Sequence, residues 1–205
     1  MPDLSDAYAL KSPEEVRALY RAWSASYDAG FGEAQGYQLP RKVAAAFVGA
    51  GGQGPVLDVG AGTGLVGGCL RRLNVAEVDA IDLSDDMLAV AKEKQLYRAL
   101  YPRDVTVPLE LPDRDYRGVV SAGTFTLGHV GPGALENLLE VALPGALFVI
   151  SVNARHYEGA GFADALAGMS DRISTPKLRD VRIFDDRADT AHRTDMARLV
   201  VFRRL

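Results

Sequence analysis

Three glycines and two aspartates in the first half of the chain have a spacing that could bind a nucleotide-like ligand. Gly60, Gly62 and Gly64 follow a short apolar segment, where glycine lets the backbone bend sharply and lets a ligand approach closely. Asp58 precedes the first glycine by two residues, and Asp82 follows the third by 18. We expect Asp82 to end a strand and to accept hydrogen bonds from both hydroxyls of a ribose. Its alternative role is a charge at the start of the following helix.

The spacing of the glycines separates two classes of cofactor. In a dinucleotide-binding fingerprint the third glycine follows the second by three residues, and here that position holds Leu65. The carboxylate of Asp58 would repel a pyrophosphate, whereas it suits the ammonium and sulfonium charges of S-adenosylmethionine (SAM). The residues therefore favour SAM over NAD. The alternative is a purely structural role for the glycines, in a tight connection between a strand and a helix.

Two residues further along the chain could recognise adenine. Asp104 could accept a hydrogen bond from the adenine amino group, while the amide of Val105 donates to the ring. Asp104 could equally be a turn residue that follows Pro102.

Three histidines are candidates for acid–base chemistry. His129 is the first candidate for a general base, because it follows the fourth predicted strand at the edge where ligands bind in such sheets. A loop histidine bonded to backbone is the alternative. His156 and Tyr157 are second candidates for contacting the acceptor, and we expect His192, in a polar segment, to be exposed.

The elements that position these residues alternate between strands and helices. Apolar runs bounded by turn residues predict strands at 56–59, 78–82, 105–107, 118–122, 146–152, 178–184 and 197–203. Capping residues and helical periodicity predict a helix that starts at residue 13 and others at 40–49, 64–73, 85–100, 133–143 and 157–168. This order predicts parallel strand pairs, and the last two strands suit an antiparallel hairpin at the sheet edge.

Composition limits the function classes. At 205 residues, 48% of them hydrophobic, the chain fits one globular domain, 1–205. Its net charge of −4 and lack of a basic stripe make nucleic acid a poor partner. The longest apolar stretch, 142–152, is interrupted by Pro144 and Gly145 and is too short to span a membrane. Cys69 falls on an apolar helix face and is expected to be a buried structural thiol. The acidic start resembles no secretory signal, so we expect a cytoplasmic protein.

The run Val56-Leu57-Asp58-Val59-Gly60-Ala61-Gly62-Thr63-Gly64, with Ala80-Ile81-Asp82-Leu83-Ser84 and Met87, resembles class I SAM-dependent methyltransferases. This resemblance implies a Rossmann-like α/β fold: a seven-stranded, mostly parallel sheet with helices on both faces and the last strand inserted antiparallel. It implies that the three glycines cradle the methionine and ribose portion, that Asp82 holds the ribose, that Leu83 or Met87 flanks adenine, and that Asp104 reads its amino group. The expected cofactor-binding set also includes Tyr27, Asp58, Ala61, Val105, Ala122 and Gly123.

A narrower resemblance concerns the N-terminal segment. Trp23-x-x-x-Tyr27-Asp28, Tyr37-x-x-Pro40 and Ala122-Gly123-Thr124-Phe125-x-x-Gly128-His129 look like the Williams-Beuren-syndrome-region methyltransferase-like group. It implies that N-terminal helices, within residues 1–50, cover the cofactor site of a core at 55–205. Tyr27 or Tyr37 would then contact the SAM carboxylate or close the pocket. Simple core packing is the alternative for these aromatic residues.

The acceptor is expected to be a small molecule methylated at oxygen or nitrogen, with S-adenosylhomocysteine (SAH) as product. The segment 121–125 lacks the Asn/Asp-Pro-Pro-aromatic signature of amino-methylating nucleic-acid enzymes, and no Pro-Cys nucleophile replaces it. A SAM-binding sensor or interaction protein without catalysis is the main alternative. An NAD-linked oxidoreductase is the third, and no metal site is expected.

Overall fold

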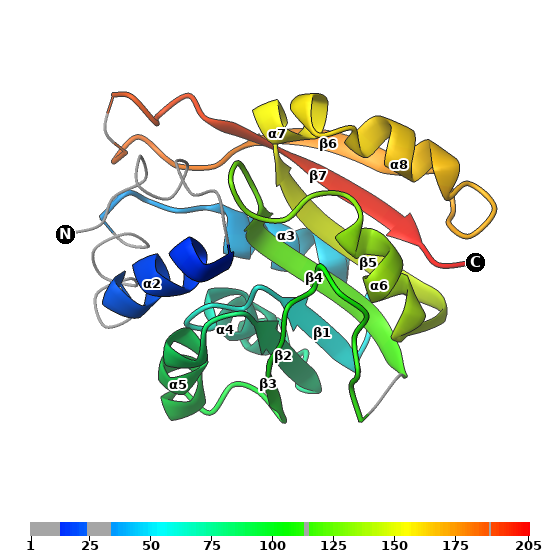
Figure 1. The fold of residues 1–205 in the computed structure, drawn as a ribbon, viewed down its shortest axis with the longest axis horizontal. Helices are drawn as coiled ribbons and strands as arrows, with labels where there is room; N and C mark the ends of the chain where they lie inside the picture. The colour runs from blue at the N-terminus through cyan, green and yellow to red at the C-terminus, as the bar shows by residue number, and fades with distance from the viewer. Residues whose placement is uncertain (1–12, 24–33, 113–114, 189) are drawn as a thin grey trace.

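A seven-stranded sheet forms the centre of the computed structural model, which describes residues 13–23, 34–112, 115–188 and 190–205 (Figure 1). The strands are β1 (Val56–Val59), β2 (Val78–Asp82), β3 (Leu100–Pro102), β4 (Tyr116–Phe125), β5 (Ala142–Asn153), β6 (Lys177–Arg182) and β7 (Met196–Arg203). Their order across the sheet is β3-β2-β1-β4-β5-β7-β6. The helices are α2 (Pro13–Trp23), α3 (Leu39–Gly49), α4 (Leu65–Arg72), α5 (Asp85–Glu93), α6 (Ala134–Glu140), α7 (Ala154–Gly159) and α8 (Phe162–Gly168).

The directions of the strands confirm the predicted fold class. β3, β2, β1, β4 and β5 pair in parallel, whereas β7 runs antiparallel to both β5 and β6. The last strand is therefore inserted antiparallel, and its hairpin with β6 is confirmed. Because parallel strands end at the same edge, the segments that follow β1, β2, β3 and β4 meet along one edge of the sheet.

Helices cover both faces of the sheet, as alternation along β1 shows. Leu57 faces a core shared with Leu135 of α6, whereas Val56 faces the opposite core with Phe47 of α3 and Leu70 of α4. All five side chains are fully buried. Both sides of the central strands are therefore packed, which explains why their sequences are nearly continuous apolar runs.

The third strand lies earlier than the sequence predicted. The helix expected at 85–100 ends at Glu93, and Gln95 has a left-handed φ of 51° that stops it from continuing. β3 then uses Leu100–Pro102 rather than 105–107. Asp104 turns the chain there, since its Oδ1 accepts hydrogen bonds from the Thr106 amide (2.8 Å) and hydroxyl (2.6 Å). The prediction of a strand at 105–107 was wrong because this turn replaces a strand ladder.

Other element boundaries also differ from the prediction: α6 ends at Glu140 rather than at residue 143, and β5 begins at Ala142 rather than at residue 146. The helix expected at 157–168 is divided into α7 and α8 by Gly161, whose φ is 77°. The strand predicted at 118–122 continues to Phe125 in β4, with a register irregularity between Ser121 and Phe125. Gly123, at φ 86°, lies in this irregularity, and bulges of this kind redirect side chains and backbone near functional sites.

The side chain of Cys69 is buried, and its sulfur accepts a hydrogen bond from Arg72 Nη2 (3.1 Å). This agrees with a structural thiol. None of the helices in the described part of the chain is long and apolar enough to cross a membrane.

Candidate functional site

The glycine-rich turn joins β1 to α4 at the carboxyl edge of the sheet. Gly60 has a φ of 65°, and a Cβ built on it would lie 1.9 Å from Thr124 Oγ1 of β4. Gly62 has a φ of 54°, but a Cβ there would meet only the end of Met87, at 3.5 Å. Packing against Thr124 alone therefore requires glycine at position 60. Gly62 has space beside it, so the absence of a side chain at this position leaves the backbone accessible to a ligand.

Asp82 connects the end of β2 to this turn. Its Oδ2 accepts a hydrogen bond from the Gly62 amide and its Oδ1 accepts one from the Ser84 amide, both at 2.8 Å. Burial raises the pKa of Asp82, while the Ser84 and Gly62 amides lower it. The Leu83 amide lowers this pKa as well, and with three amides against about four lone-pair positions the carboxylate keeps capacity for a further donor. Ser84 Oγ also caps α5 by accepting a hydrogen bond from the Met87 amide (3.3 Å).

Asp58 is fully buried behind the turn, in β1. Its Oδ2 accepts a hydrogen bond from the Tyr97 hydroxyl at 2.7 Å, whereas its Oδ1 has no hydrogen-bond partner among the described residues. The pKa of Asp58 is raised to about 7, mainly by burial; the Tyr97 hydrogen bond opposes this rise, the nearby Asp82 carboxylate adds to it, and the Gly67 amide opposes it. This carboxyl group is therefore poised to change charge near neutral pH.

The predicted adenine contacts come from β2, α5 and the segment after β3. Leu83 is half-buried and Met87 is buried, and they follow Asp82 directly along the chain. Asp104 and Val105 follow β3, so the shifted strand leaves them at the carboxyl edge. The side chain of Val105 is buried in the core, and its carbonyl accepts a hydrogen bond from Asn137 (3.0 Å), which leaves its amide as the group predicted to face adenine.

The opposite side of the turn is formed by β4 and the N-terminal segment. The Gly123 amide donates a hydrogen bond to Ser151 Oγ of β5 (3.2 Å), and a Cβ built on Gly123 would lie 2.4 Å from the Tyr37 hydroxyl. Ala122, beside it, is half-buried. Tyr37 therefore brings residues before α3 to the carboxyl edge, at the residues predicted to bind the cofactor. Tyr27 lies outside the described residues.

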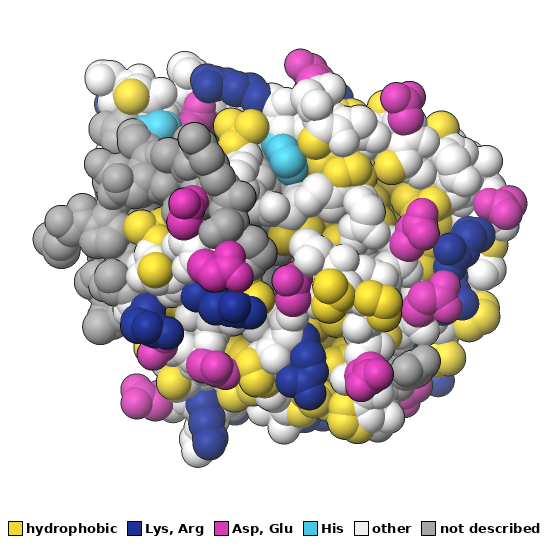
Figure 2. Space-filling view, viewed as in Figure 1, with side chains coloured by type: hydrophobic (Ala, Val, Ile, Leu, Met, Phe, Trp, Pro, Cys, Tyr) yellow, Lys and Arg dark blue, Asp and Glu magenta, His cyan; other side chains and the backbone are white. Residues whose placement is uncertain are grey.

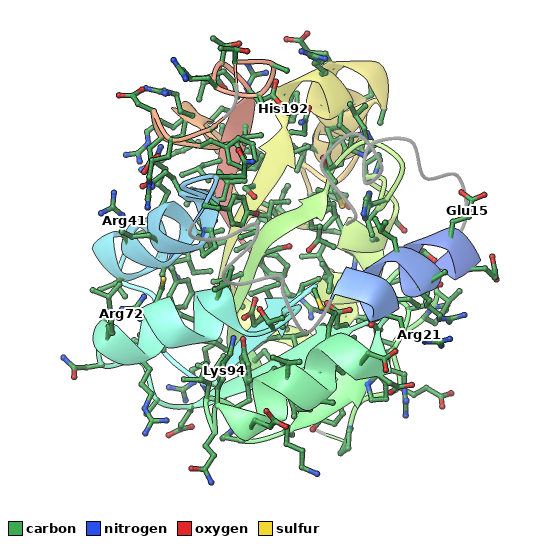
Figure 3. The ribbon with its side chains drawn as sticks, turned by 90° about the vertical axis from the view of Figure 1, so that its left-hand side faces the viewer. Glu15, Arg21, Arg41, Arg72, Lys94 and His192 are labelled. Carbon is green, nitrogen blue, oxygen red and sulfur yellow. The ribbon has the colours of Figure 1, made fainter. Side chains whose placement is uncertain are left out.

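Helix α2 lies beside α5, at the edge that follows Asp82 (Figures 1 and 3). Arg21 of α2 bonds through Nε to Asp86 Oδ2 in the first turn of α5, at 3.1 Å. Both side chains are largely exposed, so this ion pair contributes little to stability but marks where the two helices meet. Figure 2 shows acidic and basic side chains interspersed over the lower part of this face.

His129 lies in the loop between β4 and α6, and its Nδ1 is 2.9 Å from the Leu127 carbonyl oxygen. A carbonyl can only accept, so this contact puts the proton on Nδ1 and the basic lone pair on Nε2. Burial lowers the pKa of His129, which favours the neutral ring at pH 7; Leu127 raises it and His156 lowers it. The expected alternative, a histidine bonded to backbone, is thus present and is compatible with a base at Nε2.

The other candidates for acceptor contacts differ in their surroundings. His156 Nε2 lies 2.9 Å from the Val130 carbonyl oxygen, so this ring is fixed to the same loop as His129. Tyr157 is 6% exposed and stacks on Phe162. His192 is not exposed as expected. Its side chain is 16% exposed, and its Nδ1 pairs with Asp195 Oδ2 at 2.9 Å.

Sequence reasoning missed two residues that support the turn. Tyr97 bonds to Asp58 from 39 positions away, and Lys94 Nζ donates a hydrogen bond to the Thr63 carbonyl at 2.6 Å. Lys94 lies between α4 and α5 in Figure 3. Both follow α5 in a segment that was predicted to be helical, so no periodicity pointed to these contacts. Across the described ranges, no group of three or more His, Cys, Asp or Glu residues could hold a metal ion.

Residues 56–145 match a protein family described as a methyltransferase domain. They begin at β1 and include the glycine turn, Asp82 and Gly123. No curated protein matches the chain in sequence.

Solved structures share the fold over nearly the whole chain. The [4+2]-cyclase SpnF matches with a TM-score of 0.70 and 16% identity, covering 95% of this chain and 97% of its own. Magnesium protoporphyrin IX methyltransferase (ChlM) from Synechocystis PCC 6803, solved with bound SAH, gives 0.63 and 16%, covering 94% and 99%. The CcbJ methyltransferase from Streptomyces caelestis gives 0.62 and 20%, covering 89% and 96%. At these identities the likeness shows the fold.

The domain match and the fold together support a SAM-dependent methyltransferase enzyme. The predicted fold is confirmed, and the match over residues 56–145 supports the predicted methyltransferase class.

Proposed function

We propose that the chain transfers a methyl group from SAM to an oxygen or nitrogen atom of a small-molecule acceptor and releases SAH. The observation that carries this proposal is the position of Asp82. Its carboxylate is fixed by the amides of Gly62 and Ser84 and retains capacity to accept a further hydrogen bond, as ribose binding requires. Asp58 adds negative charge behind the same turn, which suits a cationic cofactor better than a pyrophosphate.

The residues we assign to the cofactor surround this carboxylate. Ribose and methionine would contact the turn, adenine would lie near α5 and the segment after β3, and the amino-acid end would face β4. The proposed contacts are Asp58, Gly60, Ala61, Gly62, Gly64, Asp82, Leu83, Met87, Asp104, Val105, Ala122, Gly123 and Tyr27.

The N-terminal segment is proposed to cover the bound cofactor, within one domain of residues 1–205. Two contacts support this: Tyr37 lies against Gly123, and Arg21 of α2 pairs with Asp86 at the start of α5. This arrangement suits the Williams-Beuren-syndrome-region methyltransferase-like group, to which we compare the chain. We propose a cytoplasmic location for an enzyme that acts on a small metabolite.

His129 is proposed to act as the general base. When bound, SAM supplies a methyl group already activated by its sulfonium, so much of the rate can come from holding the acceptor close and aligned. His129 would take the proton of an acceptor hydroxyl or amine at Nε2, because Nδ1–H is used by the Leu127 carbonyl. Its lowered pKa keeps this atom unprotonated at neutral pH.

The function is tested by incubating the protein with SAM and a cell metabolite extract and measuring SAH. We expect SAH to form with wild-type protein and to fall to background with Asp82→Ala. SAM binding by calorimetry without turnover of any extract fraction would instead favour a sensor or interaction protein. The fold allows such an outcome, since the similar SpnF is a cyclase. Binding of NAD without SAM would favour an oxidoreductase.

Once an acceptor is known, His129→Gln tests the base. Loss of a general base costs about a hundredfold or more in rate, so kcat should fall by that amount with little change in KM for SAM. His192→Gln is the matched control, because His192 pairs with Asp195 and is assigned no role in transfer. Undiminished turnover by His129→Gln would refute the assignment.

A further inference from the structure

Tyr97 fills the space beside α4 where two glycines leave room for its ring. A Cβ built on Gly67 would lie 2.5 Å from both the Cζ and the hydroxyl of Tyr97, and one on Gly64 would lie 3.1 Å from its ring. A Cβ on Gly68, the next residue, would come no closer than 3.8 Å to any atom. Gly67 is therefore required by the position of Tyr97, whereas Gly68 is not.

The position of the ring brings the Tyr97 hydroxyl within hydrogen-bond distance of Asp58 Oδ2. This contact, at 2.7 Å, is a phenol donating to a fully buried carboxyl group. Burial and the neighbouring Asp58 raise the pKa of Tyr97 well above its ordinary value, so the phenol keeps its proton and continues to donate at any physiological pH. The bond therefore stabilises the charged form of Asp58 specifically.

Among the described residues, no Lys or Arg side chain pairs with Asp58. Asp82 faces it from β2, Tyr97 from the segment after α5, and Cys69 and the Gly67 amide from α4, while the adjacent residue of β4, Val120, is apolar. In the described part of the chain, the Oδ1 of Asp58 has no hydrogen-bond partner. A buried carboxylate in this position is costly unless a cation is supplied from outside.

We propose that Tyr97 is a positioning residue of the cofactor site, whose hydrogen bond holds the negative charge of Asp58 behind the glycine turn and so strengthens binding of a cationic cofactor. The inference rests on the proposed function, because it takes SAM as the ligand of the turn. SAM carries a sulfonium charge that SAH lacks. Tyr97 should therefore contribute more to the affinity for SAM than to the affinity for SAH.

The test is calorimetric titration of wild type, Tyr97→Phe and Gly67→Ala with SAM and with SAH, at pH 6, 7 and 8. Variants are compared with wild type at the same pH, so that ionisation of the ligands cancels. Tyr97→Phe keeps the ring but removes the donor, and loss of a hydrogen bond to a charged group should weaken SAM binding roughly tenfold at pH 7. SAH binding should change much less. The midpoint of the pH dependence should rise by about one unit.

Gly67→Ala should give the same pattern, because its methyl group displaces the Tyr97 ring, whereas the matched control Gly68→Ala should bind like wild type. A merely structural role of Tyr97 would weaken SAM and SAH equally and leave the pH midpoint unchanged, which would overturn the proposal. If Tyr97→Phe lacks the wild-type thermal transition, Gly67→Ala decides by the same criterion. If wild-type protein binds neither ligand, the proposed function fails and this inference fails with it; if wild type binds both, only the inference is at stake.

Discussion

Replacing Asp58 by asparagine should make the cofactor-free protein more stable at high pH than at low pH, relative to wild type. Burial raises the pKa of Asp58 from near 3.8 to about 7 in the folded protein. Between these values the native state holds a proton that the unfolded chain has lost, so wild-type stability decreases as pH rises. The asparagine side chain of the variant does not titrate. The substitution also changes the free energy of unfolding because an amide replaces a carboxyl group beside Tyr97, and this contribution is the same at every pH.

The magnitude follows from the interval over which Asp58 titrates. Each pH unit over which the native state holds this extra proton lowers the free energy of unfolding of wild type by about 1.36 kcal/mol. Between pH 5 and pH 7 the free energy of unfolding therefore falls by about 2.7 kcal/mol. The difference in the free energy of unfolding, Asp58→Asn minus wild type, should therefore grow by about 2–3 kcal/mol between pH 5 and pH 8. For a domain of this size that corresponds to roughly 5 to 10 °C in Tm.

The assay is urea unfolding of both proteins without cofactor at pH 5 and pH 8, with Asp164→Asn, an exposed carboxyl on α8, as the control substitution. Equal m values establish that the same surface is exposed in each case. A difference between Asp58→Asn and wild type that is the same at both pH values would refute the reasoning. It would mean that Asp58 does not change charge in this range.

Two further substitutions test the packing around the site and the sheet. Gly123→Ala and Gly145→Ala both place a side chain at positive φ, 86° and 83°, so each should lose about 1–2 kcal/mol of stability in thermal melts. Only Gly123→Ala should also weaken SAM binding, because its Cβ would lie 2.4 Å from the Tyr37 hydroxyl, whereas Gly145 has open space around it. Equal affinities of the two variants for SAM would count against a cofactor site at β4. Arg98→Met should destabilise by about 2–3 kcal/mol in urea unfolding, because it removes both guanidinium bonds to Asp79, which is 1% exposed, and an unchanged unfolding midpoint would contradict this role of the pair.

The sequence predicts the central part of the fold well because its strands are apolar and its turns use glycine. The strands at 56–59 and 78–82 match β1 and β2 residue for residue, and Asp82 lies at the strand end as expected. β3 was misplaced because it has three residues, partly exposed, and ends in a proline that cannot donate to a ladder. The apolar residues Val105 and Val107 led to the prediction of a strand at 105–107 instead, although Val107 is 52% exposed.

The supporting contacts of the site could not be predicted, because they depend on tertiary distance. Nothing in the pattern around Tyr97 indicates that its hydroxyl reaches a carboxylate 39 residues earlier, or that Gly67 makes room for its ring. His192 was expected to be exposed because its segment is polar. In the structure His192 pairs with Asp195, and the polar composition of the segment does not indicate such a pair. The position of Asp82 at a strand end was therefore predictable, and the partners of the candidate site residues were not.

The insertion of β7 between β5 and β6 also constrains when the sheet can be completed during synthesis. Strands β1 to β5 can assemble as soon as they have been made, but β5 then presents an unpaired edge whose residues from Leu147 to Asn153 are buried in the finished fold. β6 emerges from the ribosome before the strand that joins it to the sheet. Until residues 196–203 are available, this edge is a template for pairing with other chains, so the interval before β7 docks is when a nascent chain most needs a chaperone.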